Sequence, residues 1–268
     1  MIAPEYAAAR RVLLDALDAL RDHLDNLILV GAQAVYLHTG EGTLAVPPMT
    51  TDADLALNTQ NLAGSPEIAQ TLVNAGFAPS VNPGHWLGDR DIAIDIMVVP
   101  HQAGVTSKTA RAARIPPHAQ TVGRIAPGLE PALVDNGFHA IASFETDDPR
   151  VFSLRVANPA ALLVAKAIKV SERDDDAHRQ PARLKAKDAL DMFRLLQAID
   201  TDVLVEGLRI HQTELEAARV SAQGIAFIRA EGKMPSGLLP RLATEAAFSD
   251  PTIAPAFAAL VRELLTAF

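Results

Sequence analysis

An aspartate lies in the middle of the most strand-like segment of the chain, and this placement limits what the segment can form. Residues 91–99, DIAIDIMVV, alternate so that Ile92, Ile94 and Ile96 share one face of a predicted strand. Asp95 falls on the other face, in mid-strand. A carboxylate there is unfavourable unless it has a partner or a function. Asp95 is therefore a candidate site residue.

A second predicted strand carries two further aspartates. In residues 49–57, MTTDADLAL, Asp52 and Asp54 fall on the same face, where like charges repel each other. Either both side chains point into water or a cation lies between them. Upstream, the apolar run 27–30 predicts a short buried strand that Gly31 ends, and a helix over 32–38 follows. Backbone N–H groups at such a turn could bind an anion.

The three aspartates and this turn together suggest a metal-dependent site. Carboxylates on neighbouring strands, beside a turn that holds phosphate, are ligands suited to a pair of Mg²⁺ ions. Two such ions about 4 Å apart can activate an attacking hydroxyl and stabilise a leaving pyrophosphate. We therefore expect Asp52, Asp54 and Asp95 to bind Mg²⁺.

The order of these motifs resembles the nucleotidyltransferase superfamily typified by DNA polymerase beta. The segments concerned read LVGAQAVYLH (29–38), TTDADLAL (50–57) and IAIDIMVV (92–99). Later, LLVAKAIKVSER and RLKAKDALDMFRLL resemble two helices of the AbiEii-type toxins of bacterial type IV toxin–antitoxin systems. The resemblance covers roughly residues 25–100 and 155–197.

The resemblance implies roles for the residues of the first half. Asp52 and Asp54 would bind the metal ions, and Asp95 would complete the site and help activate the acceptor hydroxyl. Gly31 and Ala32 would contact the triphosphate of the NTP through their backbone. The family usually has Gly-Gly or Gly-Ser at these two positions, and Ala32 lacks the hydroxyl that a serine could give to a phosphate.

Two residues of the second half also match family positions. Lys166 corresponds to a lysine that contacts nucleotide phosphates, and Asp188 to an aspartate that faces the site. A second interpretation needs no site: Lys166 and Lys169 could simply face solvent at helical spacing. Asp188 and Asp191 could pair with the neighbouring cations Lys185, Lys187 or Arg194.

The implied activity is Mg²⁺-dependent transfer of an NMP from an NTP to an acceptor hydroxyl on RNA, at the tRNA 3′ end, with release of pyrophosphate. A chain of this kind would act as an AbiEii-like toxin and have a cognate antitoxin as partner. Two alternatives stay open. The acceptor could be a small molecule or a protein, which the net charge of −8 favours slightly over nucleic acid. The chain could instead be an inactive binding protein with the nucleotidyltransferase fold, which Ala32 favours.

A local basic surface could still bind RNA despite the net negative charge. Two segments could supply it, and each could equally be a solvated face. The basic residues of these segments are Lys108, Arg111 and Arg114 in the first, and Arg179, Arg183, Lys185 and Lys187 in the second.

The expected fold class is α+β, with a small mixed sheet and flanking helices followed by a mainly helical C-terminal half. We expect a nucleotidyltransferase-like domain over 1–150 and a helical domain over 151–268, with 101–150 irregular. Ser65 and Pro66 predict the start of a helix that ends at Asn74. Further helices are expected from Asn158 to Lys169 and over 184–199.

Other classes of protein receive little support from the sequence. No apolar run is long enough to span a membrane and the N-terminus lacks the pattern of a signal peptide, so we expect a cytoplasmic protein without a membrane partner. Without cysteine there is no disulfide or thiolate site, and the histidines lack zinc-ligand spacing. Ser143, Ser153 and Ser171 lack the sequence context of a nucleophilic serine, which leaves a hydrolase unsupported.

Overall fold

The computed structural model describes residues 2–40, 44, 46–107, 109–175 and 184–268. Two compact units make up the chain. The first contains residues 1–34, 48–129 and 136–157, and the second contains 35–47, 130–135 and 158–268. The domain division at residue 150 stays a prediction. Within the described ranges, no helix has both the length and the apolar composition required to cross a bilayer.

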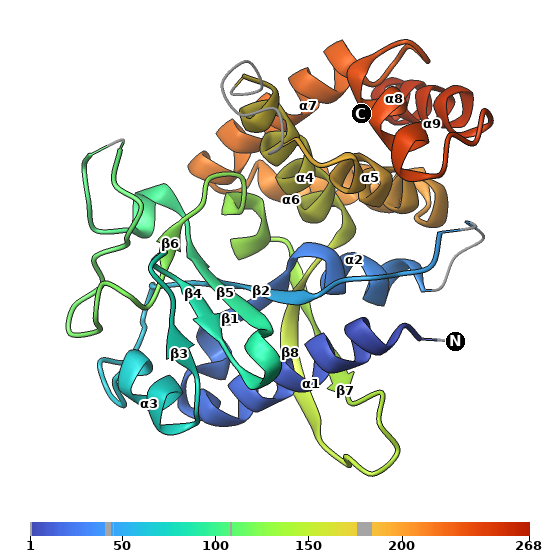
Figure 1. The fold of residues 1–268 in the computed structure, drawn as a ribbon. Helices are drawn as coiled ribbons and strands as arrows, with labels where there is room; N and C mark the ends of the chain where they lie inside the picture. The colour runs from blue at the N-terminus through green and yellow to red at the C-terminus, as the bar shows by residue number, and fades with distance from the viewer. Residues whose placement is uncertain (1, 41–43, 45, 108, 176–183) are drawn as a thin grey trace. The chain divides into compact units, whose positions relative to one another are not determined.

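A mixed sheet forms the first unit, as the sequence predicts (Figure 1). Its strand order is β3-β4-β5-β2-β1-β8-β7, and β6 pairs with β5. The β2–β5, β1–β8 and β5–β6 pairs are parallel, and the other pairs are antiparallel. The strands are β1 (Leu27–Val30), β2 (Asp52–Leu57), β3 (Ala78–Pro79), β4 (His85–Leu87), β5 (Ala93–Val98), β6 (Arg124–Ile125), β7 (Asn136–Ala142) and β8 (Val151–Ala157).

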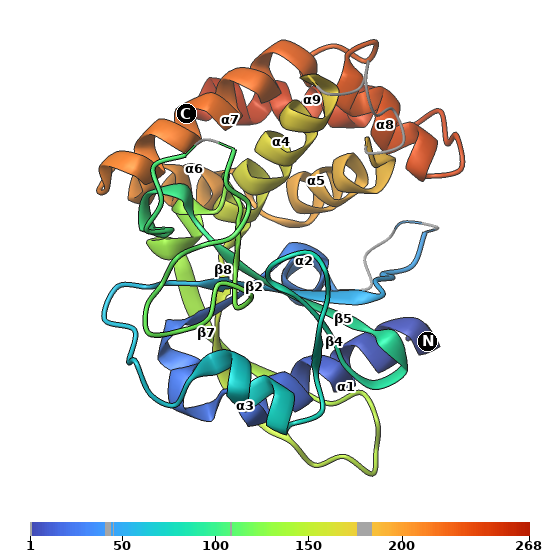
Figure 2. The same ribbon diagram turned by 60° about the vertical axis from the view of Figure 1, so that its left-hand side comes forward.

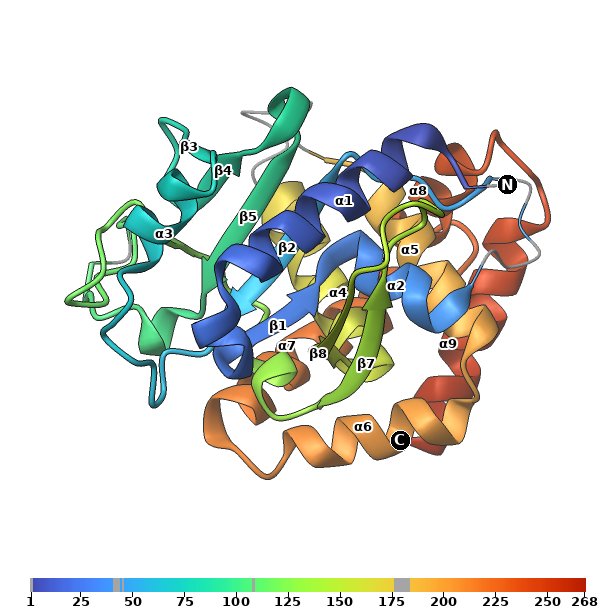
Figure 3. The same cartoon turned by 90° about the horizontal axis from the view of Figure 1, so that it is seen from below.

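Helix α1 (Pro4–Ala19) packs against the middle of this sheet, on β2 and β5 (Figure 3). Its apolar positions recur at helical spacing, so that Val12, Leu13 and Leu17 are fully buried. The other helical segments that begin in this unit are η1 (Arg21–Asn26), α2 (Gly31–Thr39), α3 (Ile68–Asn74), η2 (Asp89–Asp91) and η3 (Pro100–Gln102).

The second unit is helical, which confirms the prediction for the C-terminal half (Figure 2). Helix α4 contacts α5, α6 and α7, while α8 contacts α5 and α9. The rings of Phe193 and Phe257 stack at 6.1 Å in its core. The helices are α4 (Pro159–Asp175), α5 (Ala186–Ala198), α6 (Thr201–His211), α7 (Leu215–Glu231), α8 (Leu238–Ala246) and α9 (Ile253–Ala267), and the short η4 (Glu130–Leu133) joins them.

Helix α3 begins later than the sequence predicts. Ser65 and Pro66 precede it, and the helix starts at Ile68. The Glu67 carboxylate caps it by accepting a hydrogen bond from Gln70 N at 2.7 Å. The same carboxylate accepts from Ala119 N at 2.8 Å, a contact 52 residues away in sequence. This tertiary contact fixes Glu67 as the cap, so the local Ser-Pro signal does not decide the helix start.

The prediction that residues 101–150 are irregular is wrong in part. Strand β7 lies within this range, and β8 follows at Val151–Ala157 and pairs with it in antiparallel register. Most residues of β7 are at least partly exposed, so its sequence carries no continuous apolar pattern. In β8, by contrast, Phe152, Leu154 and Val156 are buried and alternate with more exposed residues, a period that is readable from the sequence.

Candidate functional site

The three aspartates of the first unit lie on adjacent strands. Strands β2 and β5 pair in parallel, with Asp54 directly opposite Asp95 and Asp52 opposite Ala93. Because side chains alternate along a strand, Asp52, Asp54 and Asp95 share one face of the sheet. The structure therefore brings together the carboxylates that the sequence analysis grouped.

The turn at Gly31 lies directly beside these carboxylates. Strand β1 ends at Val30, which pairs with Asp54, and α2 begins at Gly31. Gly31 has a φ of +69°, and a Cβ built on it would overlap Asp54 Oδ2. Only glycine accepts both this backbone conformation and this close approach without strain. Gly31 therefore sets the distance between the turn and the carboxylate, and Ala32, which follows it, is buried.

A buried glutamine fixes the turn relative to β2. Gln33 Nε2 donates to the backbone oxygen of Asp52 at 3.0 Å, and its Oε1 accepts from Arg10 Nε at 2.9 Å. Both side chains are almost completely buried, so each contact is made away from water. These two hydrogen bonds fix the positions of α1, α2 and β2 relative to one another at the site.

Asp95 already has two cationic or potentially cationic partners. Its Oδ1 lies 2.6 Å from His85 Nδ1, and its Oδ2 accepts from Arg124 Nη2 at 3.1 Å. His85 is opposite Asp95 on β4, and Arg124 is on β6, which also pairs with β5. Neither contact was predicted from the sequence. Nothing in the sequence marked Arg124, because its strand is only two residues long.

The carboxylates of β2 carry ligand atoms that suit a hard metal ion, as that of Asp95 does. Asp52 Oδ1 accepts a hydrogen bond from Thr50 Oγ1 at 2.6 Å, and carboxylate oxygens are the ligands that Mg²⁺ prefers. Among the residues that the structure describes, no group of three or more His, Asp or Glu side chains is arranged to hold a metal. Asp52 and Asp54 thus offer the type of ligand atom that Mg²⁺ prefers, whereas a metal ion at Asp95 Oδ2 would have to displace Arg124.

In the second unit, Lys166 and Asp188 belong to one buried ionic cluster. Lys166 Nζ donates to Asp188 Oδ1 at 2.8 Å and to Asp191 Oδ2 at 2.7 Å. Burial alone would lower the pKa of Lys166, but the two carboxylates outweigh burial and hold that pKa above its ordinary value. Lys166 is only 5% exposed, so the interpretation that it faces solvent is wrong.

Two more cations of α4 complete this cluster. Arg173 Nη1 donates to Asp188 Oδ2 at 2.7 Å, and Lys169 Nζ lies 3.3 Å from Asp188 Oδ1. Burial alone would raise the pKa of Asp188, yet Lys166, Lys169 and Arg173 hold it well below the usual range. The cluster therefore carries full charges inside the helical unit.

The basic segments are described only in part. The four described members, Arg111, Arg114, Lys185 and Lys187, are exposed. Lys108, Arg179 and Arg183 lie outside the described residues.

Comparison with known proteins does not assign the chain to a family. No protein-family model, no curated protein and no solved structure matches the chain.

Proposed function

We propose that the protein is a Mg²⁺-dependent nucleotidyltransferase that moves an NMP from an NTP to an acceptor hydroxyl on RNA, at the tRNA 3′ end. The observation that carries this proposal is the packing of the Gly31 turn against Asp54. In the sheet, Asp54 of β2 lies directly opposite Asp95 of β5. A turn at the start of a helix, with carboxylates next to it, is the arrangement that the resemblance implies for a nucleotide triphosphate and its metal ions.

Each residue has a defined part in this proposal. Asp52 and Asp54 hold the metal, which when bound supplies positive charge to the phosphates. The backbone N–H groups at Gly31 and Ala32 bind phosphate oxygens and orient the NTP. Asp95 takes the proton of the acceptor hydroxyl. Positioning and charge neutralisation account for most of the rate in phosphoryl transfer.

The resemblance also implies roles for Lys166 and Asp188. An ammonium group has three N–H donors, and Lys166 uses two of them on Asp188 and Asp191. The third donor is the one that we assign to a nucleotide phosphate. Asp188 keeps Lys166 charged and oriented, so it acts as a positioning residue.

The proposal places the protein in the cytoplasm as an AbiEii-like toxin, with an antitoxin as its neutralising partner. A second candidate is a nucleotidyltransferase-fold protein that binds a partner without turnover. It is favoured by the ion pair between Asp95 and Arg124, which occupies a carboxylate that the reaction needs, and by Ala32. A small-molecule or protein acceptor is the third possibility, and the net charge of −8 favours it over RNA.

The test is transfer of label from each α-³²P NTP onto total bacterial RNA in the presence of Mg²⁺. Wild type should label RNA of tRNA size, and Asp52→Ala should not. Asp22→Ala, which changes an exposed aspartate of η1, is the matched control and should label as wild type does. Absence of label on RNA with every NTP would exclude the tRNA acceptor. Equal labelling by Asp52→Ala would exclude the metal assignment.

A further inference from the structure

Three residues from separate segments form a buried polar chain in the helical unit. His211, at the end of α6, places Nε2 3.0 Å from Asp135 Oδ2 and Nδ1 2.5 Å from Ser221 Oγ. Asp135 follows η4, and Ser221 lies within α7. All three side chains are almost completely buried, with exposed fractions of 2% or less. The nucleotidyl-transfer site described above uses none of them.

The donors and acceptors of this chain follow from the chemistry of the carboxylate. An ionised carboxylate can only accept, so His211 carries its proton on Nε2 and donates it to Asp135. Nδ1 is then the acceptor, and the Ser221 hydroxyl donates to it. Asn158 Nδ2 donates to the other oxygen of Asp135 at 2.8 Å and fixes that carboxylate. A hydroxyl, an imidazole and a carboxylate in this order define a relay that can deprotonate serine.

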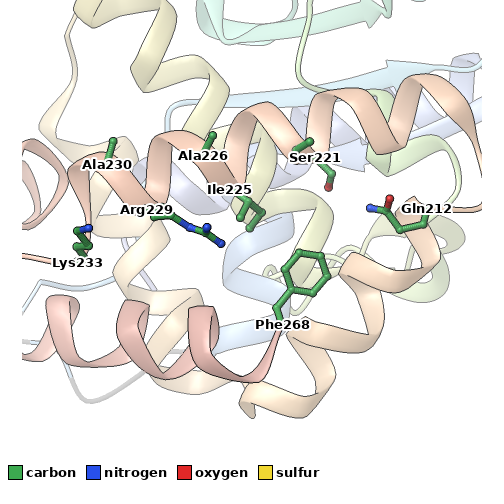
Figure 4. A pocket seen from close by; sticks show the side chains of 9 residues that line it. Gln212, Ser221, Ile225, Ala226, Arg229, Ala230, Lys233 and Phe268 are labelled. Atoms are coloured by element: carbon green, nitrogen blue, oxygen red, sulfur yellow. The ribbon is translucent and has the colours of Figure 1, made fainter.

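Ser221 also lines a cavity of about 540 Å³ (Figure 4). Small-molecule sites commonly have volumes of about 300–1,000 Å³. Most of the lining comes from one face of α7, and Gln212, Lys233 and Phe268 complete it. The hydroxyl at the end of the relay therefore lies at the wall of a space that can hold a small ligand.

The lining of the cavity indicates the chemical class of that ligand. Arg229 and Lys233 supply two positive charges, and neither side chain has an anionic partner in the described part of the chain. Ile225 and Phe268 supply apolar surface. An organic acid derivative with an apolar part and a negative charge matches both features.

We propose that Ser221 is a nucleophile that cleaves a carboxylic ester whose acyl group carries a negative charge. Ser221 Oγ attacks the ester carbonyl carbon and gives its proton to His211 Nδ1. The bond from that carbon to the alcohol oxygen breaks, and the alcohol leaves with the proton from His211. Water then attacks the acyl-serine, the acid leaves, and Ser221 regains its proton through His211.

Donors for the developing negative charge on the carbonyl oxygen come from side chains. Because Ser221 lies inside α7, its own backbone N–H belongs to the helix and is not free for this purpose. Gln212 and Arg229 line the same cavity and carry N–H donors (Figure 4). We assign Arg229 a second role, attraction of the negative acyl group.

Labelling with a fluorophosphonate tests the nucleophile directly. Ser221 Oγ should displace fluoride from phosphorus, and intact mass with peptide mapping should locate one phosphonyl group on Ser221. Ser221→Ala should not be labelled, whereas Ser236→Ala, which changes an exposed serine, should be labelled as wild type is. The proposal is wrong if folded wild-type protein is not labelled, or if it is labelled at another residue. This outcome depends on the wild-type protein alone and not on whether a variant folds.

Hydrolysis of 4-nitrophenyl esters tests the ligand class. Wild type should cleave the anionic monosuccinate ester faster than the neutral butyrate ester. Arg229→Ala should lower kcat/KM for both esters, because an oxyanion donor is lost, and should lower it about tenfold more for the anionic ester, because the charge-assisted contact with the acyl group is lost as well. An equal effect on both esters would exclude the assigned acyl charge. No NTP is present, so these results are independent of nucleotidyl transfer.

Discussion

The carboxylate of Asp54 occupies the space that a side chain on Gly31 would need. This contact joins the end of β1 to β2 and sets the approach of the α2 turn to the aspartates. It also distinguishes Gly31 from glycines that have a positive φ but open space around them. Gly76, for example, has a φ of +91° but nothing within 4 Å of the position of a Cβ.

Gly31→Ala should therefore be more destabilising than Gly76→Ala. Alanine at Gly76 costs only the left-handed backbone conformation, about 1–2 kcal/mol. Alanine at Gly31 adds an overlap with Asp54, for which overpacking costs of about 1–3 kcal/mol are typical. Urea unfolding of both variants measures the difference. Equal losses in the free energy of unfolding would show that Asp54 moves aside without cost.

Lys166→Ala should destabilise the protein by about 3–5 kcal/mol, because it leaves Asp188 and Asp191 buried with less compensating charge. Lys169→Ala is the matched control, one turn further along α4. Its side chain is 42% exposed and lies 3.3 Å from the same Asp188, so the expected loss is below about 1 kcal/mol. Denaturant unfolding of both variants decides whether burial sets the cost. Similar losses would contradict the buried cluster.

Acid should weaken the same cluster. The pKa of Asp188 is lower in the folded protein than its usual value, so folded Asp188 binds fewer protons than unfolded Asp188. Its contribution to stability is present above about pH 4, the ordinary pKa of aspartate, and is lost as the pH falls through the folded pKa. Asp188→Asn should show a shallower decrease of unfolding free energy below about pH 4. Asp202→Asn, at an exposed position of α6, should keep the wild-type slope, and identical slopes for all three proteins would contradict the assignment.

Arg124→Ala should strengthen metal binding at the aspartates. Arg124 occupies Asp95 Oδ2, so a metal ion at Asp95 must compete with the guanidinium. Removing a partly exposed ion pair worth about 1 kcal/mol predicts an approximately fivefold lower Kd. Titration with Mn²⁺, followed by electron paramagnetic resonance, measures the change. Arg124→Lys keeps the positive charge and should bind as wild type does; an unchanged Kd in Arg124→Ala would show that Asp95 is not a ligand.

The sequence was sufficient wherever a local pattern carried the information. The apolar run before Gly31 and the alternation around Asp54 and Asp95 predict β1, β2 and β5 at or near their observed bounds. Helical spacing likewise predicts the helical second half. These patterns work because side-chain periodicity reports directly which face of an element is buried.

Contacts between residues far apart in the sequence could not be predicted from such local patterns. Arg124 reaches Asp95 across 29 residues, and Asp135 reaches His211 across 76. Ser221 has no neighbour in sequence that marks it, because its partner comes from another helix. Glu67, not the Ser-Pro pair, begins α3 because its carboxylate binds a backbone group far along the chain.

The pattern of residues along the chain thus specifies the strands and helices around the aspartates and the positions of the carboxylates on them. What each carboxylate contacts depends on the folded arrangement: Asp95 is paired with Arg124, and Asp188 with the buried Lys166. This is because periodicity fixes the face of a side chain but not its partner. Partners follow from how strands and helices far apart in sequence pack together, and burial then determines how strongly their charges interact.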